Sequence, residues 1–420
     1  MEQRKIPFSP PDITEAEINE VVDALRSGWI TTGPKTKELE RLVAQRCGTN
    51  RAVCLNSNTA CAEMTLRILG IGPGDEVIVP AYTYTASASV ASHVGAKIVL
   101  VDCEKGKFTW DLRKLEEAIT ERTKAVVPVD LFGIPADFDP ILEILESKKH
   151  LFRPSQNRPE GQPPDKTGYG EKLQTLIGRP VIMEDAAHSF GAVYHGRPVG
   201  SYADFTNFSF HAVKNLTTAE GGAVTWRDIP GLDDEELYKL YMLYSLHGQN
   251  KDALQKTQLG SWEYNIAAPW FKCNMTDVHA AIGLAQMRRY DDILLKRRHM
   301  IEKYNEAFKE LPLELPAHYT GEYQSSGHLY PIRLTGRTRQ DTNAFIVKLA
   351  ERGVAANVHY KPIPLHTGYQ DMGFDPADHP NCVEQYSNMV TLPLHTVMTE
   401  DDQDYVIECV KSALRELFPV

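Results

Sequence analysis

Cysteine is scarce in this chain, and its spacing fits neither a disulfide framework nor a metal site. The seven cysteines are odd in number, and no two of them have C-x-x-C spacing. We therefore expect free thiols in a reducing cytosol, with no zinc centre built on cysteine.

Long apolar runs are also missing. No stretch stays apolar for the length that a membrane-spanning helix requires. The first residues, from Met1 to Pro11, lack the apolar core of a signal peptide. These two absences predict a cytoplasmic protein without a membrane anchor.

Positive charge is in short supply. The formal net charge is −11, and the basic residues are scattered without a long run. This balance argues against a surface for nucleic acid or for anionic membranes. An anionic substrate would therefore need a local basic pocket.

What the chain does have is a regular alternation of short apolar strands with helical patterns. Hydrophobic residues make up 42% of its 420 residues, which is enough for a sizeable core. The expected helices are 13–27, 35–48, 59–69, 84–93, 112–119 and 137–147, and the expected strands are 52–55, 76–80, 97–101, 125–129 and 180–183. This order predicts an α/β fold, in which a large domain has a mostly parallel central sheet flanked by helices. Ligands of such sheets bind outside the carboxyl ends of the strands.

The last third of the chain predicts a smaller C-terminal α/β domain. Its expected elements are one long helix or two broken helices over 280–310, a strand at 330–334, a helix at 342–352, a strand at 355–359 and a helix at 401–416. We therefore predict a large domain over 1–255, followed by a linking helix and a small domain over 256–420. Residues 148–179 are rich in Pro, Gly, Gln, Lys and Asp, which predicts a surface insertion in the large domain.

A lysine and an acid stand in an order that suits pyridoxal phosphate (PLP). Lys214 lies in a loop rich in Ser, Thr and Gly, and Asp185 ends the buried strand that starts at Val181. The lysine can hold the cofactor aldehyde as a Schiff base, and the acid can keep the pyridine nitrogen protonated, so that the ring accepts electrons. A lone lysine in a polar loop is usually a solvated side chain. The prediction therefore depends on the lysine, the acid and a phosphate site occurring together.

The stretch from Cys54 to Ala60 offers such a phosphate site. It leads from a strand into a helix, where free N–H groups and the hydroxyls of Ser57 and Thr59 favour an anion. The plainer interpretation is an ordinary helix N-cap by Ser57, Asn58 or Thr59. No Gly-Lys-Ser/Thr follows, so the stretch is not a P-loop, and the glycines at 71–75 come after the helix, so it is not a dinucleotide fingerprint.

Aromatic and histidine side chains follow other strand ends. Tyr82 or Tyr84 could stack on a flat heteroaromatic ring, although both could equally fill the interface of sheet and helix. His359 and His366 either line a polar pocket or lie on the surface as loop residues. The sequence leaves both pairs of alternatives open.

Two further residues lie close to the acid and the lysine in sequence. Asp185 and His188 have D-x-x-H spacing, but no third ligand lies nearby, so a metal site is poorly supported. Ser209 could donate to a phosphate or simply bond to the backbone of its strand. A buried acid needs a positive partner to stay ionised, and a protonated pyridine nitrogen is such a partner.

Several stretches together resemble the DegT/StrS-type family of nucleotide-sugar aminotransferases, which are fold-type I PLP enzymes. They are 27–35 (Ser-Gly-Trp-Ile-Thr-Thr-Gly-Pro-Lys), 184–188 (Glu-Asp-Ala-Ala-His), 208–215 (Phe-Ser-Phe-His-Ala-Val-Lys-Asn), 219–222 (Ala-Glu-Gly-Gly) and 274–277 (Asn-Met-Thr-Asp). The similarity runs from about Phe8 to the C-terminus, interrupted at 148–179. The most similar branch aminates C4 of UDP-linked 4-keto sugars, as UDP-4-amino-4-deoxy-L-arabinose–oxoglutarate aminotransferases do.

The resemblance implies a role for each candidate residue. Lys214 would be the Schiff-base lysine and would move the proton during transfer, and Asp185 would pair with the pyridinium nitrogen. The other implied roles are His188 beside the cofactor ring, Tyr84 stacked on it, Asn58, Thr59 and Ser209 as phosphate ligands, Thr32 and His359 near the sugar, and Lys272 reaching the phosphate site of the neighbouring subunit. The last role implies a homodimer with shared active sites.

The implied reaction has two halves. L-Glutamate would donate its amino group and leave as 2-oxoglutarate, and a nucleotide-linked 4-keto sugar would accept it for surface-polysaccharide or glycan synthesis. Other PLP chemistry on sugars, such as 3-amination or dehydration, is an alternative, although the dehydrating relatives lack the lysine that this chain has at 214. A catalytically silent regulatory relative is a third possibility. The family commonly has Gly-Tyr-Lys-Tyr-Asn where this chain has Trp-Phe-Lys-Cys-Asn, so Trp270 adds bulk beside the shared site.

Overall fold

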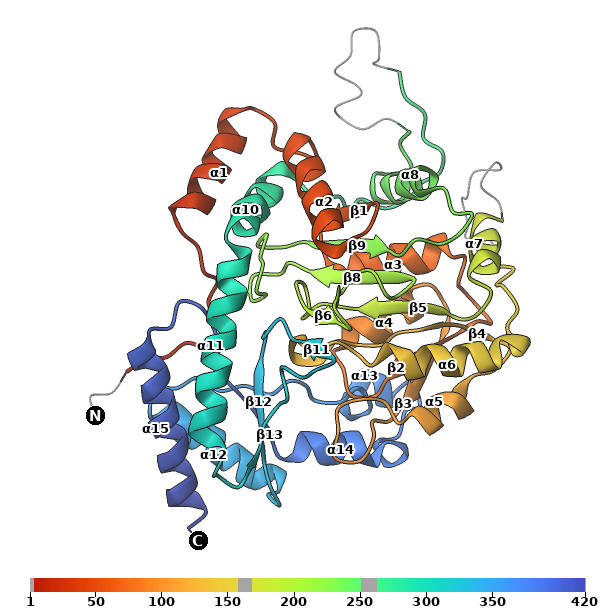
Figure 1. The fold of residues 1–420 in the computed structure, drawn as a ribbon. Helices are drawn as coiled ribbons and strands as arrows, with labels where there is room; N and C mark the ends of the chain where they lie inside the picture. The colour runs from red at the N-terminus through yellow and green to blue at the C-terminus, as the bar shows by residue number, and fades with distance from the viewer. Residues whose placement is uncertain (1–3, 158–167, 251–262, 420) are drawn as a thin grey trace.

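The computed structural model describes residues 4–157, 168–250 and 263–419. Figure 1 shows a large part built around a central sheet and a smaller part beside it, with the long helix α11 (Tyr290–Phe308) running from one to the other. Two further helices, α12 (Arg339–Glu351) and α15 (Glu400–Leu417), lie in the smaller part.

The central sheet has seven strands and confirms the predicted, mostly parallel arrangement. The strands are, in spatial order, β1 (Ala52–Leu55), β9 (Gly222–Trp226), β8 (Phe205–Ser209), β5 (Val181–Asp185), β4 (Thr123–Val126), β2 (Glu76–Pro80) and β3 (Lys97–Val101). All neighbours from β8 to β3 pair in parallel, whereas β9 runs antiparallel to both β8 and β1. Because helices cover both faces of a parallel sheet, strands such as β2 and β5 are buried along their whole length.

Helices cover both faces of this sheet. Those of the large part are α1 (Glu15–Arg26), α2 (Pro34–Cys47), α3 (Asn58–Ile68), α4 (Thr85–His93), α5 (Leu112–Ala118), α6 (Phe138–Lys148), α7 (Tyr169–Ile177), α8 (Asp234–Ser245) and α10 (Asp277–Arg288). Val77 and Val79 pack in one apolar cluster with residues of α3, α4, α7 and α8, while Ile78 packs in another with α5 and α6. Successive strand residues point to opposite faces, so the two groups of helices lie on opposite sides of β2.

Two segments differ in detail from the expected pattern. The helical stretch at 280–310 is two helices, α10 and α11, which meet at Arg289. The segment 148–179 is partly packed into the fold: α7 buries Leu173, and the Gln174 side chain donates a hydrogen bond of 2.6 Å to the Leu69 carbonyl. The predicted domain boundary at 255/256 lies outside the described residues, so the domain division stays a prediction.

The smaller part is built on an antiparallel sheet of β10 (Leu313–Glu314), β12 (Tyr330–Leu334) and β13 (Met389–Leu392). The prediction of a strand at 355–359 was wrong. This segment makes one isolated bridge, from Asn357 to Thr391, and β13 is the strand beside β12. The segment leads instead into a loop that contains Pro362 and Pro364, which have no N–H to donate to a strand ladder.

Short elements complete the described fold. They are β6 (Val193–Tyr194), β7 (Arg197–Pro198), β11 (Tyr323–Gln324), α13 (Thr367–Gln370), α14 (Pro380–Ser387) and the 3₁₀ turns η1 (Leu131–Gly133), η2 (Lys149–Leu151), η4 (Ile363–Leu365) and η5 (Pro376–Asp378). Within the described ranges, no helix is both long and apolar enough to cross a membrane. The same ranges contain no group of three or more His, Cys, Asp or Glu side chains arranged to hold a metal ion. All seven cysteines are free thiols.

Candidate active site

The carboxyl ends of β1, β5 and β8 open onto one cavity of about 370 Å³. Nine of the residues singled out in the sequence line it: Ser57, Asn58, Thr59, Tyr84, Asp185, His188, Ser209, Lys214 and His359. Thr32 and Lys272 are not among its lining residues. The structure therefore brings together the lysine, the acid and the helix N-terminus, in the place where α/β sheets bind ligands.

The carboxylate of Asp185 is held from three sides. Asn58 Nδ2 donates to Oδ1 at 2.8 Å, the Ala187 N–H donates to Oδ1 at 3.2 Å, and Ser87 Oγ donates to Oδ2 at 2.6 Å. Ser87 in turn shares a hydrogen bond of 2.9 Å with the hydroxyl of Thr83. Because these donors come from α3, α4 and the loop after β5, the direction of the carboxylate is fixed by the fold.

Lys214 lies in the loop between β8 and β9. Burial lowers the pKa of its amine from 10.5 to about 8, and the nearby Asp185 carboxylate opposes this shift. An amine with this pKa is neutral in an appreciable fraction of molecules near neutral pH, which both nucleophilic attack and proton transfer require.

His188 lies beside the lysine and is uncharged. Burial, together with the positive charge of Lys214, holds the pKa of His188 well below its usual range. Its Nδ1 accepts a hydrogen bond of 3.2 Å from the backbone N–H of Phe132, so the ring proton must be on Nε2. Nε2 then donates to the hydroxyl of Tyr360 at 2.8 Å.

A network of hydrogen bonds connects Lys214 and His188 to residues of the smaller part. Asn215 follows Lys214. Its Nδ2 donates to the Ser326 carbonyl at 2.8 Å, and its Oδ1 lies 3.0 Å from Nδ1 of His328. Ser326 Oγ donates to the His188 carbonyl at 2.5 Å, and the rings of His188 and His328 lie 4.5 Å apart. All four of these residues are buried. The network therefore joins His188 and Asn215, the residue after Lys214, to the smaller part of the fold.

The N-terminus of α3 has the predicted N-cap and also faces the cavity, while its role as a phosphate site stays a prediction. Ser57 caps the helix by accepting a hydrogen bond of 3.1 Å from the Ala60 N–H. Gly222 approaches it so closely that a Cβ there would lie 2.4 Å from the Asn58 nitrogen. The Asn58 side chain binds Asp185, while Thr59 and Ser209 line the cavity. An amine, a fixed carboxylate and a helix N-terminus in one cavity form a donor set that fits PLP.

The aromatic alternatives are distinguished by their positions. Tyr84 lines the cavity with 58% of its surface exposed, and its ring lies 5.5 Å from that of Tyr360. Tyr82 is fully buried, and its hydroxyl donates to the His359 carbonyl and accepts from the Tyr360 N–H, both at 3.1 Å. Tyr82 thus holds the loop that carries His359, whose pKa is lowered to about 4 by burial and by the charge of Lys214.

Thr32 and Lys272 both bond to Asn274, and neither lines the cavity. Asn274 Nδ2 donates to Thr32 Oγ1 at 2.6 Å, and the exposed Lys272 amine bonds to the Asn274 side-chain oxygen. Trp270, expected to add bulk at this place, instead packs inward with its ring stacked 4.1 Å from that of Tyr244.

Among the residues of this site that sequence reasoning missed are Ser87, Phe132 and Tyr360. Ser87 carried no motif signal because it lies within an ordinary run of small helical residues. Phe132 acts through its backbone N–H, which no side-chain pattern reveals. Tyr360 follows His359 directly, and this adjacency was the one signal that could have pointed to it.

Comparisons with known proteins agree with this geometry. A family model described as the DegT/DnrJ/EryC1/StrS aminotransferase family matches residues 11–152 and 178–411. The spore coat polysaccharide biosynthesis protein SpsC of Bacillus subtilis is 35% identical, over 98% of this chain and 97% of its own length. A PMP-form structure of Spr1654 from Streptococcus pneumoniae, assigned as a sugar aminotransferase, is 50% identical with a TM-score of 0.92, and the match covers 98% of this chain and 100% of that one. A PLP-form structure of the same protein is 48% identical, also with a TM-score of 0.92. The chain therefore belongs to the DegT/DnrJ/EryC1/StrS aminotransferase family and is a PLP-dependent sugar aminotransferase with a fold-type I architecture.

Proposed function

We propose that the protein transfers the amino group of L-glutamate to C4 of a nucleotide-linked 4-keto sugar, with UDP as the expected nucleotide. The product would serve the synthesis of a surface polysaccharide or glycan, and the polysaccharide role in the name of SpsC supports this assignment. The observation that carries the proposal is the Lys214 amine, with its pKa near 8, in the same cavity as the fixed carboxylate of Asp185.

Bound PLP supplies an electron sink, which stabilises negative charge on the carbon that loses a proton. Asp185, oriented by Asn58 and Ser87, would hold the pyridine nitrogen in its protonated form. Lys214 would bind the aldehyde carbon of the cofactor, which is its C4′. Once released, the amine of Lys214 would carry the proton between this C4′ and the substrate carbon. The neutral His188 would lie beside the ring without placing a competing positive charge there.

Other residues would position the cofactor and the sugar. Thr59, Ser209 and the N–H groups of α3 would bind the phosphate, with Asn58 contributing through its backbone because its side chain binds Asp185. Tyr84 would stack on the ring. Thr32 and His359 would lie near the sugar, on the evidence of the resemblance.

Lys272 would complete the site of a second subunit. Its amine is exposed and lies outside the cavity of its own chain, as a residue acting on a neighbouring copy would. We therefore propose a cytoplasmic homodimer with two shared active sites.

Transfer of labelled nitrogen tests the reaction. The enzyme would be incubated with L-[15N]glutamate and either a UDP-linked 4-keto sugar or a UDP-linked 3-keto sugar, and the sugar product analysed by mass spectrometry and NMR. We expect label at C4 of the first sugar, none in the second, and none in either with Lys214→Ala. Label at C3 instead would show that the enzyme is a 3-aminotransferase. Glutamate turnover without a labelled sugar would show that it aminates another acceptor.

Mixed subunits test the shared site. Lys214→Ala and Lys272→Ala would each be nearly inactive alone, yet a hybrid of the two contains one site with both lysines intact. Unfolding and refolding an equimolar mixture should therefore restore a substantial part of the activity, while each variant treated alone stays inactive. If the mixture is no more active than its components, Lys272 does not act across the dimer.

A further inference from the structure

A second cavity lies in the smaller part of the fold, near the end of α15. It encloses about 500 Å³ between the loop after α11, the end of β12 and the last turn of α15. It shares no lining residue with the cavity around Lys214. Any ligand that it binds therefore occupies a site separate from the aminotransferase centre.

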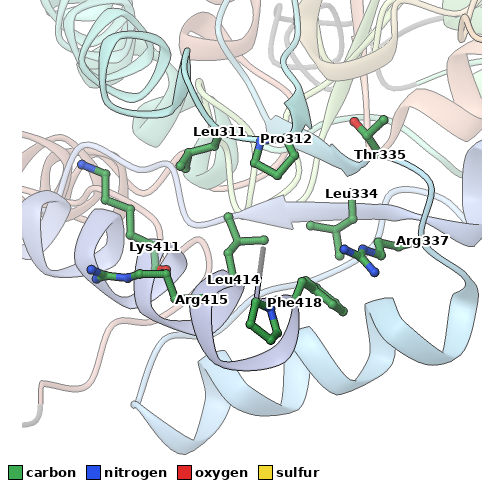
Figure 2. Close-up of a pocket in the computed structure, with 10 residues that line it drawn as sticks. Leu311, Pro312, Leu334, Thr335, Arg337, Lys411, Leu414, Arg415 and Phe418 are labelled. Atoms are coloured by element: carbon green, nitrogen blue, oxygen red, sulfur yellow. The ribbon is translucent and has the colours of Figure 1, made fainter.

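The inner surface of this cavity is apolar. Leu334 and Leu414 are buried at its base, and Phe418 is half-buried beside them. Leu311 and Pro312 line the opposite side, as Figure 2 shows. A volume of this size accommodates a short alkyl chain or a single ring, which such side chains would remove from water.

Positive charges flank this apolar surface. Lys411 and Arg415 lie on one side of Leu414 and Phe418, and Arg337 lies on the other (Figure 2). No aspartate or glutamate is among the lining residues. The lining of this cavity is therefore positively charged, although the chain as a whole has a net charge of −11.

These cations have few competing partners in the described parts of the chain. The Arg337 guanidinium lies 4.2 Å from the ring of Phe418, and Arg415 Nε donates to the Lys411 carbonyl at 3.3 Å. Neither arginine makes an ion pair there, and the pair of Lys411 with Glu408 is long, at 3.8 Å. Of the nearby acids, Glu416 pairs with Arg352, and Asp341 caps α12 through Thr338 while its carboxylate also attracts Arg337 without forming an ion pair with it. The positive groups thus remain available to an anion.

We propose that this cavity binds a small amphipathic anion: one short alkyl chain or ring that carries a single carboxylate or phosphate. The apolar part of the ligand would contact Leu334, Leu414 and Phe418. Its anionic group would lie at the opening, between Arg337 and the pair Lys411 and Arg415. Arginine suits this role because its planar donors match carboxylate and phosphate oxygens.

Three related probes separate the two halves of this recognition. Octanoate carries both the tail and the charge, 1-octanol carries the tail alone, and acetate carries the charge alone. Calorimetric titration of the full-length holoenzyme should give one octanoate per chain, bound at least about ten-fold more tightly than either other probe, because both halves contribute. Equal affinity for octanoate and 1-octanol would overturn the proposal.

Matched variants locate the site. Arg337→Gln combined with Arg415→Gln should weaken octanoate binding at least about ten-fold by removing both arginine charges. The control, Arg41→Gln with Arg113→Gln, removes two exposed arginines of the large part and should bind octanoate as the parent does. Thr335→Trp adds bulk at the exposed edge of the cavity and should also abolish binding. Unchanged binding in the double arginine variant or in Thr335→Trp would show that octanoate binds somewhere else.

Vesicles distinguish a lipid head group from a free anion as the source of the ligand. Sedimentation with phosphatidylglycerol vesicles but not with phosphatidylcholine vesicles, abolished in the double arginine variant, would assign the anion to a lipid. Octanoate binding without sedimentation would assign it to a free carboxylate or phosphate. Sedimentation that the double arginine variant retains, together with no octanoate binding, would contradict the proposal.

Discussion

The backbone N–H of Phe132 donates a hydrogen bond of 3.2 Å to Nδ1 of His188. This contact fixes the tautomer of the histidine, because a nitrogen that accepts a hydrogen bond carries no proton. The proton is therefore on Nε2, where it reaches the hydroxyl of Tyr360 at 2.8 Å. The backbone of Phe132 and the side chain of Tyr360 thus determine together the tautomer and orientation of the His188 ring.

The His188 tautomer can be observed directly. We expect 15N NMR of the apoprotein to show His188 protonated at Nε2 and still neutral at pH 5, because burial and Lys214 hold its pKa well below the usual range. Tyr360→Phe should remove one hydrogen bond and reduce turnover about five-fold, as the loss of about 1 kcal/mol implies. A doubly protonated His188 at pH 5 would contradict this description of the site.

Ser87 orients Asp185, the acid that we propose holds the cofactor nitrogen. Ser87→Ala removes a hydrogen bond of 2.6 Å to a carboxylate, an interaction of about 2 kcal/mol, and should weaken PLP retention by more than ten-fold. Ser89→Ala changes the same helix two residues away, at a residue that is not among the donors to Asp185, and serves as the control. Equilibrium dialysis of the cofactor measures both variants. Equal retention by the two would show that Asp185 does not need this donor.

The turn at Phe132 and Gly133 is fixed by sterics as well as by hydrogen bonds. Gly133 has a φ of +94°, and a Cβ there would lie 2.4 Å from Ser326 Oγ and 2.9 Å from the His328 nitrogen. Gly106 has a φ of +79° with nothing within 4 Å of a Cβ. Gly106→Ala should cost about 1 kcal/mol of unfolding free energy, and Gly133→Ala about 3 kcal/mol or more. Urea denaturation compares them, and equal losses would mean that the turn can move away from the smaller part.

Lys214 gives the apoprotein a defined pH dependence. Its amine becomes neutral as the pH rises through about 8, so the rate of PLP uptake should rise to that pH and then level off. A rate that keeps rising toward pH 10.5, the ordinary lysine value, would contradict the lowered pKa.

The same shift has a consequence for stability. Between pH 8 and 10.5 the unfolded chain keeps the Lys214 proton that the folded chain has lost, so the contribution of this lysine to the free energy of unfolding should rise with pH in this window. Lys214→Met removes the titrating group, and the difference in stability between it and the parent isolates the contribution of this lysine. A difference that does not change with pH would mean that the folded and unfolded states share one pKa at this position.

The sequence predicted the parts of the site that depend on local order along the chain. Strand and loop patterns placed Asp185 and Lys214, because the carboxyl ends of neighbouring parallel strands meet at one edge. Ser87 and Tyr360 could not be predicted in this way, since they lie 98 and 172 residues from the groups that they bind. The expected strand at 355–359 failed for a similar reason: its apolar pattern was local, but Tyr82 and two prolines hold the following loop at the active site.

The visible absorption spectrum of the purified protein, recorded before and after addition of L-glutamate, tests the central claim most directly. We expect a yellow protein whose long-wavelength band disappears with glutamate and returns when a 4-keto sugar nucleotide is added. Lys214→Ala should show neither the starting band nor its cycle. A protein that stays colourless after reconstitution with PLP, or a band that ignores glutamate, would contradict glutamate-dependent transfer at this site.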